Sequence, residues 1–183
     1  MILPIYIYGT DVLRTKSKEV TPDYEGLEKL ISDMFETMYA SDGVGLAAPQ
    51  IGRAIRLFVV DASVLKDDFP ETDGFKRVFI NPEILWSSEE KVSMSEGCLS
   101  LPGISEQVTR PVEVKIRYQD EHFETHEETL KGFNARVFQH EFDHIEQTLF
   151  TDRISPMRKQ MVKRKLQKLA KGIVDADYPT VTK

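Results

Sequence analysis

The chain has 183 residues, of which 40% are hydrophobic and 30% are charged, a size and balance that fit one globular domain. Its formal net charge of −6 argues against DNA or another nucleic acid as the main partner, because binding to phosphates favours a basic surface. No apolar run approaches the roughly 20 residues that span a bilayer, and the amino terminus lacks the features of a signal peptide, so the sequence predicts a cytoplasmic protein without membrane contact.

The first predicted element is a helix from about Thr21 to Ala40. Thr21 is a candidate N-cap and Pro22 suits the first helical position. Six apolar side chains recur at helical spacing and mark one buried face: Leu27, Leu30, Ile31, Met34, Phe35 and Met38. The segment 41–52, which is rich in glycine and contains a proline, cannot continue as a regular helix or strand.

The middle of the chain predicts four strands. They cover residues 55–60, 78–85, 112–118 and 123–130, with a polar exposed loop at 66–74, a turn at 119–122, and Pro82 at an edge or a bulge. Two more helices follow at about 134–147 and 155–172, and then a tail at 173–183. This order predicts a single α+β domain over residues 1–183, in which mostly antiparallel β-sheets pack around a central helix, with one helix near each terminus.

The helix at 134–147 contains His140, Glu141 and His144 in the pattern H-E-x-x-H. Residues four apart lie on one helical face, so two imidazoles can bind one metal ion, and the glutamate can accept a proton from metal-bound water. Two surface histidines on an ordinary helix are the alternative. His122 and His126 are also four apart, but in a hairpin strand they would lie about 13 Å from each other, which indicates solvated surface.

The same helix divides into three stripes at roughly 100° per residue. An apolar stripe contains Phe138, Phe142, Ile145 and Leu149, a narrow wet stripe contains Gln139, Asp143 and Glu146, and a mixed stripe contains Val137, His140, Glu141 and His144. Two buried stripes and one wet stripe predict a helix deep in the domain. A buried glutamate is costly unless a partner such as a divalent cation compensates its charge.

A catalytic metal site of this kind needs a third protein ligand beside a water molecule. Glu146 and Asp152 lie downstream, but Glu146 falls on the wet stripe. The only cysteine, Cys98, lies in the glycine- and proline-punctuated segment 96–103, where irregular backbone can approach a ligand closely. A thiolate and two imidazoles would form a tetrahedral set with one open position, and a buried core thiol is the alternative.

Three segments resemble the signature motifs of peptide deformylases. They are GVGLAAPQ at 43–50, EGCLS at 96–100 and QHEFDH at 139–144, in the family's order and at compatible spacing. The resemblance extends across most of the chain, and at one variable position, where relatives commonly have Met, Phe142 stays apolar. It implies a cytoplasmic, bacterial-type metal-dependent hydrolase that removes the formyl group from N-formylmethionine of newly made polypeptides and releases formate.

The resemblance also implies the roles of the site residues. Cys98, His140 and His144 would bind one divalent metal ion, with metal-bound water as the nucleophile and Glu141 as the general acid/base. The family more often works with Fe2+ in cells, although Zn2+, Ni2+ or Co2+ can occupy the site.

Three further residues would act on the substrate. The Gln50 side-chain amide and the Leu99 backbone N–H would stabilise the oxyanion, and Gly45 would contribute a backbone contact to the substrate. From the residues alone, a loop amide that satisfies backbone groups is the plainer interpretation of Gln50.

Candidates for the methionine pocket are Val44, Phe133 and Val137, each of which could equally be ordinary core. Arg136 could line the pocket mouth with its apolar stem. Glu96 is expected to order the Cys98 loop, with a plain surface carboxylate as the alternative, and Arg110 could act similarly.

The helix at 155–172 is strongly basic. It has no acidic residue, seven basic ones (Arg158, Lys159, Lys163, Arg164, Lys165, Lys168 and Lys171) and an apolar side formed by Met157, Met161, Leu166, Leu169 and Ile173. A docked helix with a solvated charged face is the plainer interpretation. The other is a helix that contacts ribosomal RNA and brings the enzyme near emerging chains, as relatives with a similar terminal helix suggest.

Three other functions remain open at this point. A small metallopeptidase would share the helix motif and differ in its substrate. A non-enzymatic binding module stabilised by metal would normally need four protein ligands. A thiol enzyme would use Cys98 with a histidine as its base.

Overall fold

Three α-helices and three separate β-sheets build the chain, which a computed structural model describes over residues 1–183. The α-helices are α1 (Leu27–Ala40), α2 (Gly132–Ile145) and α3 (Pro156–Ala170). The strands are β1 (Ile5–Tyr6), β2 (Gly45–Ala47), β3 (Leu57–Asp61), β4 (Lys76–Ser87), β5 (Lys91–Gly97), β6 (Ser105–Pro111), β7 (Glu113–Gln119), β8 (Thr125–Lys131) and β9 (Thr180–Val181). Short 3₁₀ helices are η1 (Asp11–Arg14), η2 (Ala48–Ile51), η3 (Ser63–Leu65), η4 (Pro70–Thr72) and η5 (Phe150–Asp152).

The largest sheet is antiparallel throughout, with the strand order β2-β3-β4-β7-β8. The pairing of β4 with β7 shifts register between Ile80 and Glu83, on either side of Pro82. Proline has no N–H for the ladder, so this irregularity lies where the sequence predicts it. A separate antiparallel hairpin pairs β5 with β6, and a parallel pair joins β1 to β9. The predicted α+β class with mostly antiparallel sheets is confirmed.

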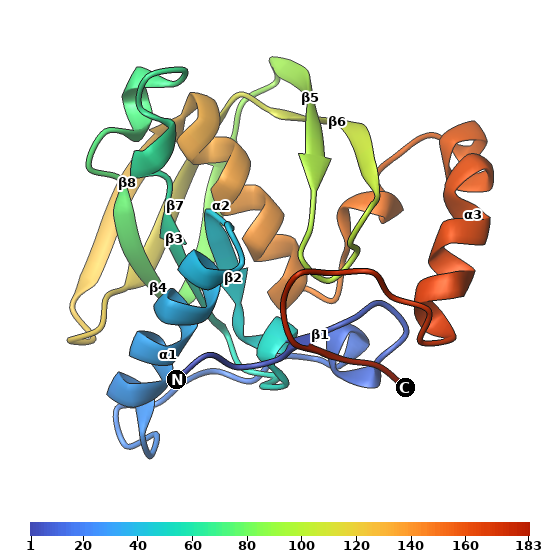
Figure 1. Cartoon of the computed structure of the whole chain (residues 1–183). Coiled ribbons are helices and arrows are strands. Elements are labelled where there is room, and N and C mark those ends of the chain that lie inside the picture. The colour runs from blue at the N-terminus through green and yellow to red at the C-terminus, as the bar shows by residue number, and fades with distance from the viewer.

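Helix α2 runs between the five-stranded sheet and the β5–β6 hairpin (Figure 1) and contacts strands of both. On its sheet side, the Phe138 ring lies 5.3 Å from Phe58 and 5.0 Å from Phe79 between ring centroids. A second and larger apolar cluster contains Met34 and Met38 of α1. Because structure covers α2 on several sides, most of its polar side chains are buried as well.

The wet stripe predicted for α2 is wrong for two of its three members. Glu146 is exposed, but Gln139 and Asp143 are only 6% and 3% exposed. The Gln139 amide donates hydrogen bonds to two backbone carbonyls, and Asp143 pairs with two arginines from elsewhere in the chain. These partners, which a helical wheel cannot reveal, compensate the burial of the two polar groups.

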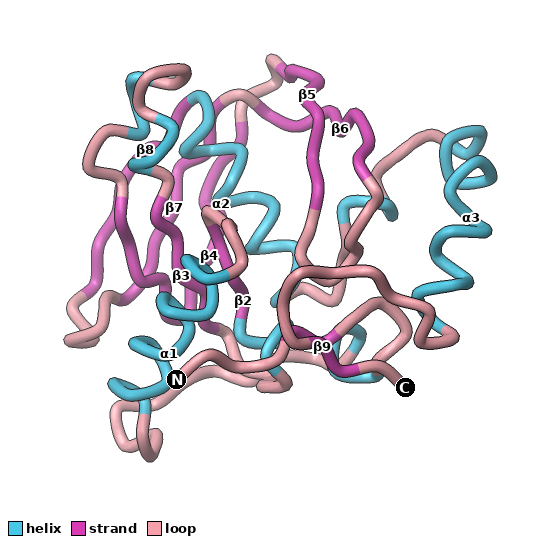
Figure 2. The backbone as a smooth tube through the Cα atoms, in the orientation of Figure 1, coloured by secondary structure: helices cyan, strands magenta, loops and turns pink.

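Several predicted boundaries also differ from the structure. The first helix begins at Leu27 rather than Thr21, because Gly26 adopts the left-handed conformation with φ 72°. The hairpin β5–β6 was not predicted, and the predicted tail contains β9. Figure 2 shows β9 in the long loop that returns from α3 toward β1.

Helix α3 lies on the far side of the β5–β6 hairpin from the five-stranded sheet (Figure 1). It buries Val162 and Leu169, whereas Met157 and Met161 are 73% and 61% exposed. The predicted apolar side is therefore wrong for these methionines, and also for Ile173 beyond the helix, which is 62% exposed. All seven basic residues of this segment are exposed. None of the helices has the length and apolar character needed to cross a bilayer.

Candidate active site

The cysteine and the two motif histidines converge where β5 ends beside α2. Cys98 follows directly after β5, and the helix places His140 and His144 one turn apart. The Cys98 Sγ lies 3.3 Å from His144 Nε2, and one ligand atom from each of the three residues lies within 4.8 Å of the others. Ligands of one tetrahedral zinc-type ion are about 3.5 Å apart, and no fourth such side chain joins the group.

The chemistry of these groups fits a divalent cation. A thiolate and two imidazole nitrogens are a common donor set for transition metals. Burial lowers the pKa of His144 well below its ordinary value, which keeps the ring neutral and able to bind a cation. The buried Glu141 Oε2 has no hydrogen-bond partner in the chain, and Glu141 Oε1 lies 4.0 Å from His140 Nε2. The site therefore has an unpaired carboxylate oxygen beside the three potential metal ligands.

Glu96 orients the first histidine. Its Oε1 lies 2.8 Å from His140 Nδ1, which leaves His140 Nε2 for a metal. Arg110 donates two hydrogen bonds to Glu96, at 2.6 and 2.9 Å, and Arg136 donates one at 2.6 Å. Burial alone would raise the pKa of Glu96, but hydrogen bonds from His140 and Arg110 outweigh it and hold this pKa far below its ordinary value. Glu96 is thus a buried carboxylate that stays ionised.

Arg110 also connects Glu96 to α2. Its Nη1 donates to Asp143 Oδ2 at 2.9 Å, and Arg153 donates to both oxygens of Asp143 at 2.6 and 2.7 Å. The sequence pattern gave no sign of this role for Asp143, and for Arg136 it gave only a place at the cavity and not the buried hydrogen bonds. Arg136 is only 4% exposed, and its guanidinium bonds to Glu96 and to two carbonyls of the β5–β6 hairpin rather than reaching solvent.

Glu141 is buried deeply enough to titrate near neutrality. Burial raises the pKa of Glu141 to about 7, although the neighbouring His140 opposes this shift. A carboxyl group with such a pKa can both accept and release a proton near pH 7. Gly45, on β2, lies directly against this side chain.

Two possible hydrogen-bond donors lie beside Cys98. Gln50, on η2, accepts a hydrogen bond from the Ala47 N–H at 2.9 Å, and this fixes its amide. Its Nε2 then points to Ser100 Oγ at 3.2 Å and to Cys98 Sγ at 3.4 Å. The Leu99 N–H donates no hydrogen bond within the chain.

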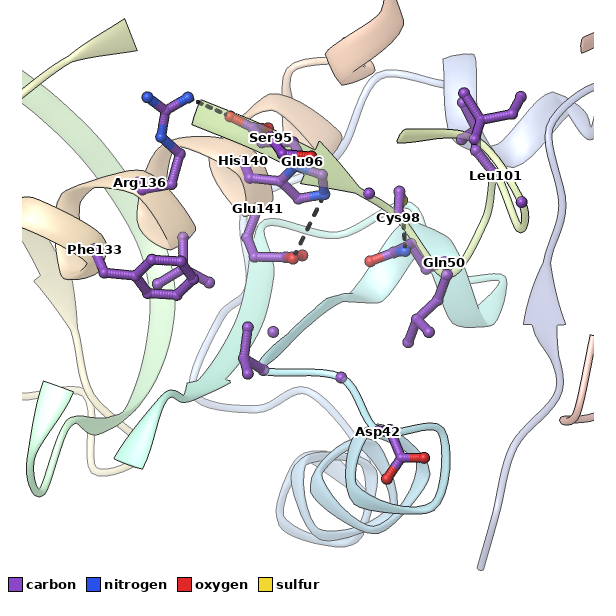
Figure 3. A pocket seen from close by; sticks show the side chains of 18 residues that line it. Asp42, Gln50, Ser95, Glu96, Cys98, Leu101, Phe133, Arg136, His140 and Glu141 are labelled. Atoms are coloured by element: carbon purple, nitrogen blue, oxygen red, sulfur yellow. Dashed lines mark hydrogen bonds and ion pairs between the residues drawn. The ribbon is translucent and has the colours of Figure 1, made fainter. Parts of the chain in front are cut away.

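A cavity of about 400 Å³ opens over these groups. The predicted site residues that line it are Val44, Gly45, Gln50, Glu96, Cys98, Leu99, Phe133, Arg136, Val137, His140 and Glu141. His144 is the exception and is only 2% exposed. Figure 3 shows Gln50 beside Cys98, and Glu141 pointing toward His140. Sequence reasoning missed several lining residues, among them Asp42 and Ser95, which carry no motif signal of their own.

The β7–β8 turn gathers a second group of possible ligand atoms, from Asp120, Glu124 and His126. His126 Nε2 lies 2.7 Å from Asp120 Oδ2. The side chains of His122 and His126 are 74% and 44% exposed, as expected for solvated surface. A surface ion pair accounts for this group.

Comparison with known proteins shows to which family the chain is related. Residues 2–160 match the family model described as polypeptide deformylase. The chain is 47% identical to a peptide deformylase of Salinibacter ruber, covering 100% of this chain and 96% of the relative. It is 48% identical to one of Flavobacterium psychrophilum, covering 97% and 95%.

Solved structures agree with these relatives. The crystal structure of peptide deformylase from Thermus thermophilus has a TM-score of 0.83 and 40% identity, with 94% of this chain and 100% of that chain covered. One from Plasmodium falciparum has a TM-score of 0.82 and 41% identity, covering 92% and 95%. By sequence and by structure, the chain belongs to the polypeptide deformylase family.

Proposed function

We propose that this chain removes the formyl group from N-formylmethionine at the start of newly made polypeptides and releases formate. One observation carries the proposal beside the family match. A thiol, two imidazoles and a buried carboxylate without a partner meet at one cavity. The match favours deformylation over the small metallopeptidase, and the cavity beside three ligands favours an enzyme over a closed structural metal site. The chain would act in the cytoplasm as one catalytic domain over residues 1–183.

Cys98, His140 and His144 would hold one divalent metal ion. We propose Fe2+ for the cell, and Zn2+, Ni2+ or Co2+ suit the same soft and imidazole donors. When bound, the ion supplies Lewis acidity, which lowers the pKa of nearby water and polarises the formyl carbonyl. Glu96 would hold the His140 ring in the orientation that the site needs.

Glu141 would move the protons. Its Oε2 takes a proton from the attacking water and later delivers it to the methionine nitrogen as the C–N bond breaks. A carboxyl with a pKa of about 7 suits both steps, because it is neither too weak a base nor too weak an acid near neutral pH.

Gln50 and Leu99 would stabilise the negative charge that develops on the formyl oxygen. The Gln50 Nε2 lies 3.4 Å from Cys98 Sγ. The Leu99 N–H, from the residue after Cys98, has no acceptor within the chain. One such donor typically lowers the barrier by about 3 kcal/mol.

The rest of the cavity would bind the peptide. Val44, Phe133 and Val137 supply an apolar lining suited to a methionine side chain, with the stem of Arg136 beside them. The Gly45 backbone would contact the substrate. A formyl group carries a hydrogen atom where larger acyl groups carry a carbon chain. A narrow site could therefore exclude the larger groups.

The test is formate release from a formyl-Met peptide, with metal analysis of protein prepared without oxygen. We expect one equivalent of metal, formate release that a chelator abolishes, and no cleavage of the same peptide without its formyl group. Peptide-bond cleavage without formate would indicate the metallopeptidase instead. Activity that resists the chelator but is lost with a thiol reagent would indicate a thiol enzyme.

We also propose that the basic face of α3 contacts ribosomal RNA. Exposed lysines on this helix support the proposal. Replacing Lys163 and Lys168 together by Glu should weaken co-sedimentation with ribosomes and leave hydrolysis of a short formyl-Met peptide unchanged. Unaltered co-sedimentation would refute the contact.

A further inference from the structure

Residues Cys98 to Leu101 form a tight turn at the catalytic cavity. The Leu101 N–H donates to the Cys98 carbonyl at 3.0 Å, which closes the turn. The peptide between Leu99 and Ser100 is therefore the central peptide of a four-residue turn. A flip of this peptide to the type II arrangement would require a positive φ at Ser100, which residues other than glycine disfavour, and Ser100 is not among the residues with a positive φ. The turn itself therefore favours one direction for the Leu99 carbonyl, and a donor from elsewhere must satisfy that carbonyl.

Both ends of the chain hold this turn from outside. The Tyr178 hydroxyl donates to the Leu99 carbonyl at 2.6 Å, across 79 positions in the sequence. The Tyr8 N–H donates to the Ser100 carbonyl at 2.9 Å. Tyr178 provides the only hydrogen bond to the Leu99 carbonyl within the chain. A residue of the C-terminal segment thus anchors the central peptide of the turn.

The segment that carries Tyr178 is itself anchored. Pro179 accepts a hydrogen bond from the Ile5 N–H at 2.9 Å, and Val181 accepts one from the Ile7 N–H at 3.0 Å. A residue before proline is restricted to extended backbone, which limits the directions in which the Tyr178 side chain can point. The ring also packs against the larger apolar cluster. The anchored C-terminal segment therefore holds the Tyr178 hydroxyl in position to donate to the Leu99 carbonyl.

This turn also holds two groups that act on the substrate. Leu99 offers its free N–H, and Ser100 Oγ accepts from Gln50 Nε2 at 3.2 Å. A shift of the whole turn would move the Leu99 N–H within the cavity and the Ser100 hydroxyl relative to Gln50. The position of the turn consequently affects both proposed oxyanion donors.

We propose that Tyr178 is a positioning residue of the deformylation reaction, which holds the turn from Cys98 to Leu101 in place and thereby positions both donors. This inference rests on the function proposed above. Tyr178 does not line the cavity, so it acts through the turn and not on the substrate. The C-terminal segment is then part of the catalytic framework, although it lies outside every motif.

The test compares Tyr178→Phe, which keeps the ring and deletes the donor, with Tyr24→Phe as a control. Tyr24 is also partly buried, and its hydroxyl has one hydrogen-bond partner, Arg53, away from the turn. For Tyr178→Phe we expect kcat to fall about tenfold, since small misplacement of catalytic donors is costly, with KM within about twofold. Metal content should stay at one equivalent, and the control should match wild type.

A second readout does not depend on activity. Amide hydrogen exchange at Leu101, measured by NMR on the zinc-loaded protein, should become roughly fivefold faster in Tyr178→Phe, the loss expected for about one net hydrogen bond. Unchanged exchange would overturn the anchoring of the turn, and faster exchange with an unchanged kcat would overturn the catalytic role. Equal effects of Tyr24→Phe would also overturn the proposal. A wild-type protein that releases no formate would instead refute the proposed function, while exchange still tests the turn.

Discussion

Gly45 lies so close to Glu141 that a methyl group on Gly45 would stand 2.8 Å from Glu141 Oε1 and 2.9 Å from its Cγ. These are separations that real Cβ atoms essentially never show, so one of the two residues would have to move. Glu141 is 4% exposed, and it lines the cavity. The absence of a side chain at position 45 therefore fixes where the proposed proton carrier can lie.

Gly45→Ala should displace the Glu141 carboxylate and lower kcat by about tenfold to a hundredfold. The bound metal should remain at one equivalent, because none of its three ligands is touched. Gly26→Ala is the matched control, since it introduces backbone strain far from the cavity, where nothing lies within 4 Å of the added group. The control should lose some stability and keep its kcat; wild-type turnover by Gly45→Ala would contradict the packing argument.

Replacing Glu141 itself separates chemistry from metal binding. Glu141→Gln keeps the size of the side chain but can no longer accept a proton, so formate release should fall by about two to four orders of magnitude. Metal analysis should still find one equivalent per chain. Retention of full activity would remove Glu141 from the mechanism.

Cys98→Ala should abolish stable metal binding, because two imidazoles alone form an incomplete site. His126→Ala is an informative control, since it removes a histidine from the second group of possible ligand atoms on the β7–β8 turn. Dialysis against a weak chelator followed by metal analysis should find about one equivalent in His126→Ala and none in Cys98→Ala. Two equivalents in the wild type and one in each variant would mean that the β7–β8 turn also binds metal.

The buried ion pairs of Arg110 should matter more for folding than those at the surface. Arg110→Met would leave Glu96 and Asp143 without a major partner in surroundings where their side chains are 5% exposed. Loss of one partner from a buried pair costs about 3–5 kcal/mol of unfolding free energy, measurable by urea titration of metal-free protein. Arg117→Met, which removes a solvent-exposed arginine from two ion pairs, should leave the unfolding midpoint nearly unchanged. Equal losses of unfolding free energy in Arg110→Met and Arg117→Met would contradict the greater importance of the buried ion pairs.

The metal-binding geometry was predictable where helical periodicity determines it. His140 and His144 are one turn apart in any regular helix, so their shared face follows from the sequence. The contribution of Cys98 did not follow from spacing, because its position depends on how β5 approaches α2. It was proposed as the only cysteine in an irregular segment, with a core thiol as the alternative, and the family resemblance then favoured it. The pairing of Asp143 with Arg110 was missed for the same reason, since a helical wheel ranks polarity without showing partners.

The β5–β6 hairpin was missed because its buried positions are partly charged. Alternate residues of β6 are buried, but two of these, Glu106 and Arg110, are ionised side chains that other elements neutralise. Strand prediction relies on alternating apolar residues, and that signal is absent here. The contact between Tyr178 and Leu99 could not be predicted from the sequence, because only the finished fold brings the two residues together.

Asp152, which lies outside the catalytic site, should make the free energy of unfolding depend on pH. Burial would raise the pKa of Asp152, but hydrogen bonds from Arg14, at 2.6 and 3.1 Å, and from the Leu149 N–H, at 2.8 Å, outweigh it and lower this pKa. The ionised carboxylate thus favours the folded state. Its contribution is fully present above the unfolded pKa of about 3.9 and is lost as the pH falls through the folded value.

Asp152→Asn should therefore be less stable than wild type at pH 7, and the difference should shrink as the pH is lowered from about 5 to 3. Urea unfolding of both proteins, kept metal-free with a chelator, measures this difference without interference from acid-induced release of metal. Because the other titrating groups are common to both proteins, their effects cancel in the comparison. A difference in unfolding free energy that stays constant across this range would mean that Asp152 acts through the shape of its cap and not through its charge.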